Sequence, residues 1–163
     1  MPRLPSPFTD APAFEPPPTD ALIASIEAEL GLRLPPAYIA LSRLHNGGHV
    51  ARNAHPAPTP TTWAEDHVGI TSIAAIGRTA PFSLCGPAGN TFWITVWGYP
   101  DIGLYFADCP SAGHDLIALD YRHGDEPSVV HVDQERDYQI TPLAADFPSF
   151  IAGLIDDDTF DLD

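Results

Sequence analysis

Two segments near the start of the chain carry the apolar spacing of amphipathic helices. In the first, leucine and isoleucine recur at intervals of four over residues 22–30, so one helical face is apolar. Thr19 or Asp20 is suited to cap its N-terminus, and Gly31 is suited to end it because glycine tolerates left-handed dihedrals. The pattern therefore predicts a helix that ends at Gly31.

A second helix is predicted to open at a proline pair, because proline is tolerated in the first helical turn. Its expected buried stripe consists of Tyr38, Leu41 and Leu44. Asn46 and the two glycines after it are expected to stop the helix, since Asn and Gly accept left-handed dihedrals.

Three stretches between this helix and the centre of the chain are less regular. Residues 49–66, rich in proline and threonine, are expected to form a loop. Residues 68–76 are short and apolar, which favours a strand that runs into a helical turn. Residues 90–96 fit two structures, because their β-branched residues favour a strand while Asn90 is suited to cap a short helix. Both alternatives stay open at this point.

Strand patterns dominate the second half of the chain. Residues 102–106 and 116–119 form alternating or continuous apolar runs, and the turn between them contains proline, serine and glycine. Residues 128–132 and 137–140 are expected to form a third and a fourth strand. Sequential strands with short connections favour antiparallel pairing.

A last helix is predicted to begin at Asp146, which is suited to cap it. Phe147, Phe150, Ile151 and Leu154 then share one helical face. In chain order, the elements predict an α+β fold: a single domain with an antiparallel meander sheet and helices packed on one face.

The two ends of the chain differ from this domain in composition. Residues 1–18 contain seven prolines, so they are expected to form an extended or disordered leader, which Phe8 and Phe14 are placed to lay across the domain. Residues 156–163 are rich in aspartate, so they are expected to be a mobile acidic tail. The folded domain is therefore expected to span residues 19–155.

The chain is strongly acidic, and its charge is unevenly placed. There are 22 acidic residues against seven arginines, no lysine, and a formal net charge of −15. Residues 97–163 hold 15 of the acids and two of the arginines. Such a surface repels nucleic acid and anionic membranes, because phosphate contacts need Lys and Arg. A basic partner would be attracted, but acidity also serves solubility alone, and charge does not decide between the two.

The cysteines and the first residues bear on location. Neither Cys85 nor Cys109 belongs to a CxxC pair, so both are expected to be small buried residues, which suits a reducing compartment. Residues 1–10 lack the apolar core of a signal peptide, and no apolar run reaches the ~18 residues of a membrane span. The sequence therefore predicts a cytoplasmic protein.

Polar residues cluster around the first strand pair and raise the question of metal binding or catalysis. A metal set would combine His114, Asp115 and Asp120 with Asp101, Asp108 or His131. Successive residues on a strand point to opposite faces, however, so we favour a structural role in which Asp108 and Asp115 accept backbone hydrogen bonds. We expect no metal and no cofactor. No G-x-S-x-G motif occurs, and the lack of lysine excludes Schiff-base chemistry.

Three motifs follow one another in a characteristic order. The pattern E-x-x-L-G-x-x-L-P-x-x-Y runs from Glu27 to Tyr38, an Asn-Gly-Gly stop follows at residues 46–48, and a helix of the form F-x-x-F-I follows Asp146. In order and spacing these motifs resemble those of the SUKH superfamily, the Smi/Knr-type domain. The resemblance covers about residues 19–155.

This resemblance implies an α+β fold without catalytic activity. Bacterial members of the superfamily are mostly immunity proteins, each of which binds and neutralises a toxin, and fungal members are regulatory scaffolds. For this chain the resemblance and the charge together favour a non-enzymatic immunity protein whose cognate toxin is basic, for example a nuclease. The alternatives are a regulatory scaffold with an endogenous partner and a metal-dependent hydrolase built on His114 and Asp115. The oligomeric state stays open.

The expected contact residues are aromatic or charged and lie near the strand pair or in the polar loop. Trp63 is the best candidate for an exposed aromatic anchor, and Tyr99 is placed to line a groove. The full set consists of Trp63, Tyr99, Asp101, Asp108, His114, Asp115, Asp120, Asp125, Glu126 and Asp133.

Overall fold

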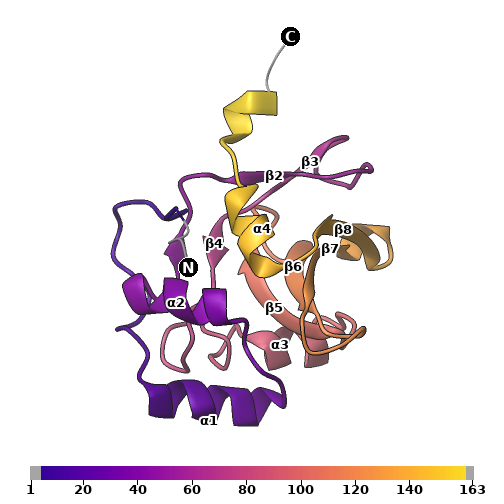
Figure 1. Cartoon of the computed structure of the whole chain (residues 1–163). Helices are drawn as coiled ribbons and strands as arrows, with labels where there is room; N and C mark the ends of the chain where they lie inside the picture. Colours follow the sequence, from indigo (N-terminus) through magenta and orange to yellow (C-terminus); the bar gives the residue numbers. More distant parts are fainter. Residues whose placement is uncertain (1–4, 161–163) are drawn as a thin grey trace.

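A six-stranded antiparallel sheet runs through the centre of the computed structural model, which describes residues 5–160 (Figure 1). The strands lie in the order β1-β4-β5-β6-β7-β8. They span Gly48–His49 (β1), Ser72–Ile73 (β4), Gly103–Asp108 (β5), Asp115–Asp120 (β6), Ser128–Asp133 (β7) and Gln139–Ala144 (β8). The four longest strands pair with their neighbours in the sequence, so the predicted antiparallel meander is confirmed. The bounds predicted for the fourth strand, residues 137–140, were wrong, because positive φ at Asp137 and Tyr138 delays β8 to Gln139, from which it runs to Ala144.

A separate two-stranded hairpin lies beside the main sheet, at the upper right of Figure 1. It consists of β2 (Ala54–Pro56) and β3 (His67–Gly69). The prediction of a plain loop over residues 49–66 was therefore wrong, and so was the helical turn within residues 68–76. β2 and β3 are only three residues long each, so apolar alternation has too few positions to reveal them.

Helix α1 spans Asp20–Leu30 and begins and ends where its local signals place it. The Thr19 side chain accepts a hydrogen bond from the Leu22 N–H at 3.1 Å. Gly31 ends the helix with a φ of 70°, which an L side chain rarely adopts. Both predicted end signals are confirmed.

Helices α2 (Pro36–Leu44) and α4 (Phe147–Ala152) also match their predicted positions. The Asp146 carboxylate caps α4 by accepting a backbone N–H of its first turn at 2.8 Å. One residue of the predicted stripe on α2 was wrong, because Leu44 is 57% exposed. Ser42 is buried instead, so the buried face of α2 consists of Tyr38, Leu41 and Ser42.

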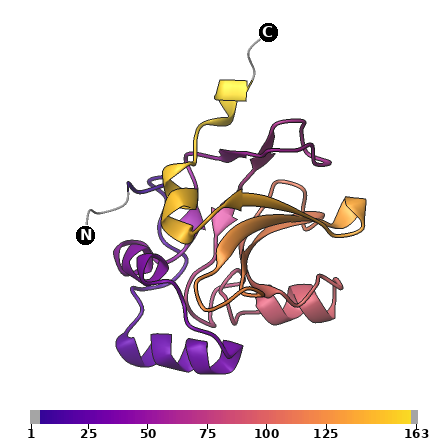
Figure 2. The same cartoon turned by 45° about the vertical axis from the view of Figure 1, so that its right-hand side comes forward.

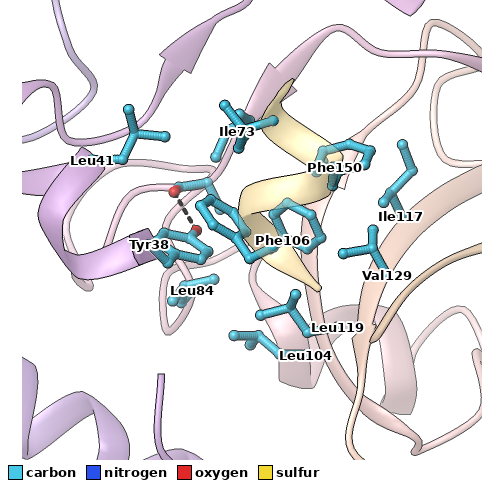
Figure 3. Packing of buried hydrophobic residues seen from close by; sticks show 14 of the residues in the cluster. Tyr38, Leu41, Ile73, Leu84, Leu104, Phe106, Ile117, Leu119, Val129 and Phe150 are labelled. Atoms are coloured by element: carbon cyan, nitrogen blue, oxygen red, sulfur yellow. Dashed lines mark hydrogen bonds between the residues drawn. The ribbon is translucent and has the colours of Figure 1, made fainter. Parts of the chain in front are cut away.

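The larger hydrophobic core lies between one face of the sheet and helices α1, α2 and α4 (Figure 3). Tyr38 of α2, Phe106 of β5 and Phe150 of α4 are fully buried there. Tyr38 stacks on Phe147, with ring centroids 4.9 Å apart. Its hydroxyl donates to the Ala74 carbonyl at 2.6 Å, so the buried phenol has its hydrogen-bond partner.

The opposite face of the sheet carries a smaller apolar core, which includes Trp93 and Tyr105. Helix α3 (Asn90–Thr95) covers this face, across the sheet from α1 and α2 (Figure 2). The Asn90 side chain accepts the Tyr105 N–H at 2.9 Å and donates to the Gly103 carbonyl at 3.2 Å. Asn90 therefore ties α3 to β5 rather than capping the helix. The α+β fold is confirmed, with helices on both faces of the sheet instead of one.

Aromatic rings attach the end segments to the domain. Phe8 is buried, and its ring stacks on His45 with centroids 4.4 Å apart. Phe160 closes a short 3-10 helix (Asp157–Phe160) and stacks on His67 at 4.0 Å. This part of the predicted mobile tail is therefore packed, because its aromatic residue reaches the hairpin.

Residues 1–4 and 161–163, which belong to the predicted leader and tail, lie outside the described residues. Between residues 5 and 160, no helix is both long enough and apolar enough to cross a lipid bilayer.

Candidate functional site

The ten residues predicted to contact a partner differ in exposure and do not form one continuous surface. Five of them are exposed: Trp63, Asp101, His114, Asp125 and Glu126. Tyr99, Asp115, Asp120 and Asp133 are buried, and Asp108 is half-buried. The structure therefore separates residues that can meet a partner directly from residues that can act only through others.

A small pocket brings four of these residues together. This pocket, here called the Trp63 pocket, has a volume of about 50 Å³. Three segments distant in the sequence build it: the β2–β3 connection, the β5–β6 turn with the start of β6, and the end of β7 with the 3-10 helix that follows. Its lining residues are Thr62, Trp63, Ser111, His114, Asp115, Asp133 and Glu135.

The β2–β3 connection is held over the sheet by hydrogen bonds to the β7–β8 segment. The Thr62 N–H donates to Asp133 Oδ2 at 2.8 Å. The Arg136 guanidinium donates to the carbonyls of Pro60 and Thr61, both at 3.3 Å. These contacts fix the segment that presents Trp63.

The Trp63 ring lies close to Gly69 and Pro110. A Cβ atom at Gly69 would come within 3.0 Å of the Trp63 Nε1 atom and 3.1 Å of the Pro110 ring. Glycine therefore lets the indole approach the β3 backbone closely. The side chain remains 44% exposed, as the sequence led us to expect of a residue in a polar loop.

Asp115 forms the buried inner wall of the pocket. Its Oδ2 atom lies 2.7 Å from Nε2 of His131, which is fully buried. Its Oδ1 atom accepts a hydrogen bond from the Ser111 hydroxyl, whose oxygen accepts the Asp115 N–H at 3.0 Å. Cys109 also donates to this carboxylate. Both Asp115 oxygens are therefore occupied by groups of the chain.

Asp133 lies directly opposite Asp115 in the β6–β7 register and is also fully buried. Its Oδ2 atom accepts the Thr62 N–H, and Nε of Arg136 lies 3.9 Å from the same oxygen. Its Oδ1 atom is buried and has no hydrogen-bond partner among residues 5–160. Like charges directly opposite each other on neighbouring strands are destabilising, so this pair favours a cation nearby.

The outer rim of the pocket carries an exposed ion pair. His114 Nδ1 lies 2.7 Å from a carboxylate oxygen of Glu135, and each side chain is about half exposed. The His114 ring also meets Trp97 edge-on, with centroids 5.5 Å apart. Glu135 was not among the predicted contact residues, because the sequence placed it only in a solvated turn.

Asp120, at the far end of β6 from Asp115, forms its contacts within its own segment. Its carboxylate accepts hydrogen bonds from Nε and Nη2 of Arg122 at 2.9 and 2.7 Å and from the Arg122 backbone N–H at 3.0 Å. The hydrogen bonds from Arg122 lower the pKa of Asp120. Because β6 separates the two aspartates by its full length, a metal set of His114, Asp115 and Asp120 does not form.

Tyr99 and Asp108 also have structural contacts. Tyr99 is 2% exposed, and its hydroxyl donates to the Gly113 carbonyl at 2.6 Å, so it fixes the β5–β6 turn and does not line a surface groove. Asp108 accepts the Ser72 hydroxyl at 2.5 Å, between β4 and β5. Burial raises the pKa of Asp108 above its ordinary value despite this hydrogen bond.

A larger hollow of about 650 Å³ lies between α2, α4 and the β6–β7 turn. We call it the α2–α4 groove. Asp125 and Glu126 are on its rim, together with Glu27 and Asp146. The sequence indicated Glu27 only as a motif position and Asp146 only as a helix cap, so their common location was missed. Its apolar lining includes Leu34, Pro35, Pro36, Ile39, Phe147 and Pro148.

A metal ion would find N, O and S donors together at Cys109, Asp115 and His131, whose ligand atoms lie within 4.8 Å of one another. In the structure these groups already satisfy one another through the carboxylate of Asp115. Burial raises the pKa of the Cys109 thiol well above its ordinary value, so the thiol stays protonated at neutral pH. Exposed aspartates at residues 156–158 form a second such group among the described residues.

Comparison with known proteins gives one match. The model of the SMI1/KNR4 family (SUKH-1) matches residues 17–153. Searches of curated proteins and of solved structures gave no significant match.

Proposed function

The chain belongs to the SMI1/KNR4 family (SUKH-1), and from this premise we propose that it is a non-enzymatic immunity protein that binds and neutralises a basic toxin. The proposal places the protein in the cytoplasm, where the toxin would act. Family membership supports a protein-binding role, and the charge of the chain supports a basic partner.

The observation that carries the choice of partner is the concentration of acids on the C-terminal part of the chain. Residues 97–163 carry 15 acids and two arginines, whereas residues 1–96 carry seven acids and five arginines. Several of these acids are exposed, among them Asp101, Asp125 and Glu126. An acidic surface accelerates encounter with a basic protein and disfavours acidic competitors.

The α2–α4 groove and the Trp63 pocket support the proposal because each combines apolar or aromatic surface with carboxylates. In protein–protein interfaces, buried apolar or aromatic side chains supply most of the binding energy, and charged residues around them orient the two proteins. Asp125 and Glu126 provide such a rim at the groove, and Glu135 provides one at the pocket.

The test is affinity capture from the source cells with the purified protein at low and high salt, followed by reconstitution with the captured partner. We expect a basic protein whose toxic activity is abolished at equimolar ratio, and whose capture weakens as salt rises. A captured housekeeping protein whose activity does not change would favour the regulatory-scaffold alternative. Capture that is equally tight at all salt concentrations would contradict the electrostatic part.

A charge-matched pair of variants sharpens this experiment. Asp125→Asn with Glu126→Gln removes two charges from the acidic part, and Asp10→Asn with Asp20→Asn removes two from the N-terminal part. The first pair should slow association with the purified partner by about tenfold at low salt, and the second should have little effect. Equal effects would mean that only net charge matters.

A further inference from the structure

We propose that the Trp63 pocket binds one cationic side chain of the partner, preferably an arginine, as the anchor of the interface. The proposal rests on the proposed function for the identity of the partner. The pocket's affinity for a guanidinium group is a property of this chain alone and can be measured without the partner.

The charge balance inside the pocket is the first argument. Asp115 and Asp133 are both buried and face each other across β6 and β7. His131 pairs with Asp115. Within residues 5–160, the ion pair of Asp133 is with Arg136, whose Nε lies 3.9 Å from Oδ2. Buried carboxylates are rarely left without a full complement of donors. The pocket therefore carries negative charge that a further cation would compensate.

The second argument is the unpartnered oxygen of Asp133. Asp133 is fully buried and lines the pocket, and its Oδ1 atom accepts no hydrogen bond from the described part of the chain. Leaving a buried charged acceptor unsatisfied is costly, so a donor that reaches it gains a strong, charge-assisted bond. Asp115 offers no such opening, since Ser111 and His131 occupy its oxygens.

The walls and the size of the pocket favour a guanidinium group. Trp63 forms one wall and is 44% exposed, so its indole face can meet an incoming cation. Glu135 on the rim supplies another carboxylate. The volume of about 50 Å³ exceeds the roughly 10–15 Å³ that one water molecule needs and suits a small planar head. Arginine combines stacking on aromatic rings with several directed donors, which a lysine ammonium does not.

A divalent cation is the competing occupant. Cys109, Asp115 and His131 provide ligand atoms at suitable spacing, but binding would break the Asp115–His131 hydrogen bond and deprotonate a thiol whose pKa is raised. A guanidinium group needs neither change. It would donate to Oδ1 of Asp133, which has no partner within residues 5–160, and would leave the Asp115–His131 hydrogen bond intact.

The direct test is titration of the isotope-labelled protein with methylguanidinium chloride, against sodium chloride at equal ionic strength. Backbone and indole N–H resonances are followed by NMR. We expect saturable shifts confined to Thr62, the Trp63 indole and the neighbours of Asp133. Asp133→Asn retains an oxygen that can accept the Thr62 N–H and should weaken binding about tenfold or more. Trp63→Ala provides a second variant at a partly exposed position, and Asp10→Asn, at an exposed acid of the N-terminal part, is the charge-matched control that should not change binding.

Three results would overturn the proposal. Shifts could remain unsaturated and spread over all exposed acids, or Asp133→Asn could bind methylguanidinium as well as the parent. Alternatively, Zn²⁺ could shift the same resonances at stoichiometric concentration while methylguanidinium does not, which would make the pocket a metal site.

Binding experiments with the captured partner distinguish failure of the pocket proposal from failure of the proposed function. If a toxin is captured and Asp133→Asn binds it as tightly as the parent chain and the Asp10→Asn control do, the function stands and the pocket proposal fails. If methylguanidinium binds as expected but no toxin is neutralised, the pocket stands and the immunity function fails.

Discussion

Strand β6 begins and ends with a buried aspartate, and the two ends are neutralised in different ways. At Asp120 the compensating cation is Arg122, two residues further along the chain, and its guanidinium and backbone together supply three donors. At Asp115 the partner is His131 on the neighbouring strand, and one oxygen of the opposing Asp133 has no donor within residues 5–160. The contacts of Asp120 are therefore complete within its own segment, whereas those of the Asp115–Asp133 pair depend on distant segments.

This difference teaches that a buried acid is not by itself evidence of function. A carboxylate compensated within its own turn stabilises that turn. The donors of the Asp115–Asp133 pair, by contrast, come from three separate segments, one of them the β2–β3 connection, which makes this pair the better candidate for contact with a partner. The following predictions break or sharpen this contrast, beginning with the largest expected effect.

Removal of the imidazole partner of Asp115, at the start of β6, should have the largest effect on stability. His131→Leu leaves the buried Asp115 carboxylate without its imidazole partner, and we expect a loss of about 3–5 kcal/mol in the free energy of unfolding. Urea denaturation followed by circular dichroism measures this. His123→Leu, at an exposed histidine, is the matched control and should leave the unfolding midpoint unchanged. Equal midpoints for both variants would show that the Asp115–His131 contact contributes little.

Removal of the charge of Asp120, at the other end of β6, should have a moderate effect on stability. Asp120→Asn weakens the charge-assisted hydrogen bonds from Arg122, and we expect a loss of about 1–2 kcal/mol in the free energy of unfolding. The same urea experiment tests it. A variant as stable as the parent would mean that the partly exposed Arg122 is equally well solvated without its partner.

The two ends of β6 also lead to a pH prediction. Arg122 lowers the folded-state pKa of Asp120, so this group contributes stability above the unfolded-state pKa of 3.8 and loses it as pH falls through the lower folded value. Asp120→Asn should therefore flatten the acid limb of the stability curve below about pH 4. Denaturation midpoints from pH 7 to pH 2.5 measure this, and parallel curves for parent and variant would contradict it.

Asp108 should act in the opposite sense. Burial raises its folded-state pKa, so the stability it contributes is present below 3.8 and is lost as pH rises through the higher folded value. Asp108→Asn should consequently lose less stability than the parent as pH rises from 3 to 7. If the free energy of unfolding rose more steeply with pH in the parent than in Asp108→Asn over this range, the sign would be contradicted.

The smallest effect on stability is expected at Asp133, where the largest effect on binding is also expected. Asp133→Asn relieves the like-charge opposition to Asp115 and retains an acceptor for Thr62, so the free energy of unfolding should change by less than about 1 kcal/mol. A much larger loss would mean that Asp133, like Asp120, is mainly structural. Measured beside Asp120→Asn, this variant directly compares the two ends.

Local signals in the sequence predicted the elements whose ends are fixed by neighbouring residues. Thr19 and Gly31 bound α1, and Asp146 caps α4, because these contacts span only a few residues. The β5–β6–β7 meander followed from runs of apolar residues separated by short turns. The β2–β3 hairpin was missed because its strands are short and its turn is long.

The candidate site was predicted as a set of residues, and only part of the set could be located in advance. Trp63 and His114 were expected near a contact surface and are exposed. Tyr99 was expected to line a groove and is buried, since its hydroxyl finds a carbonyl in the next turn. Whether any of the set touches a partner stays a prediction.

The sequence by itself determined the family motifs, the acidity of residues 97–163, and the helices and long strands whose periodicity and caps are local. Tertiary structure decided which acids are buried and which groups neutralise them. Asp133 meets Thr62 across 71 residues and Asp115 meets His131 across 16. Such pairs depend on sheet register and on how the hairpin folds over the sheet, and neither is encoded in the spacing of nearby residues.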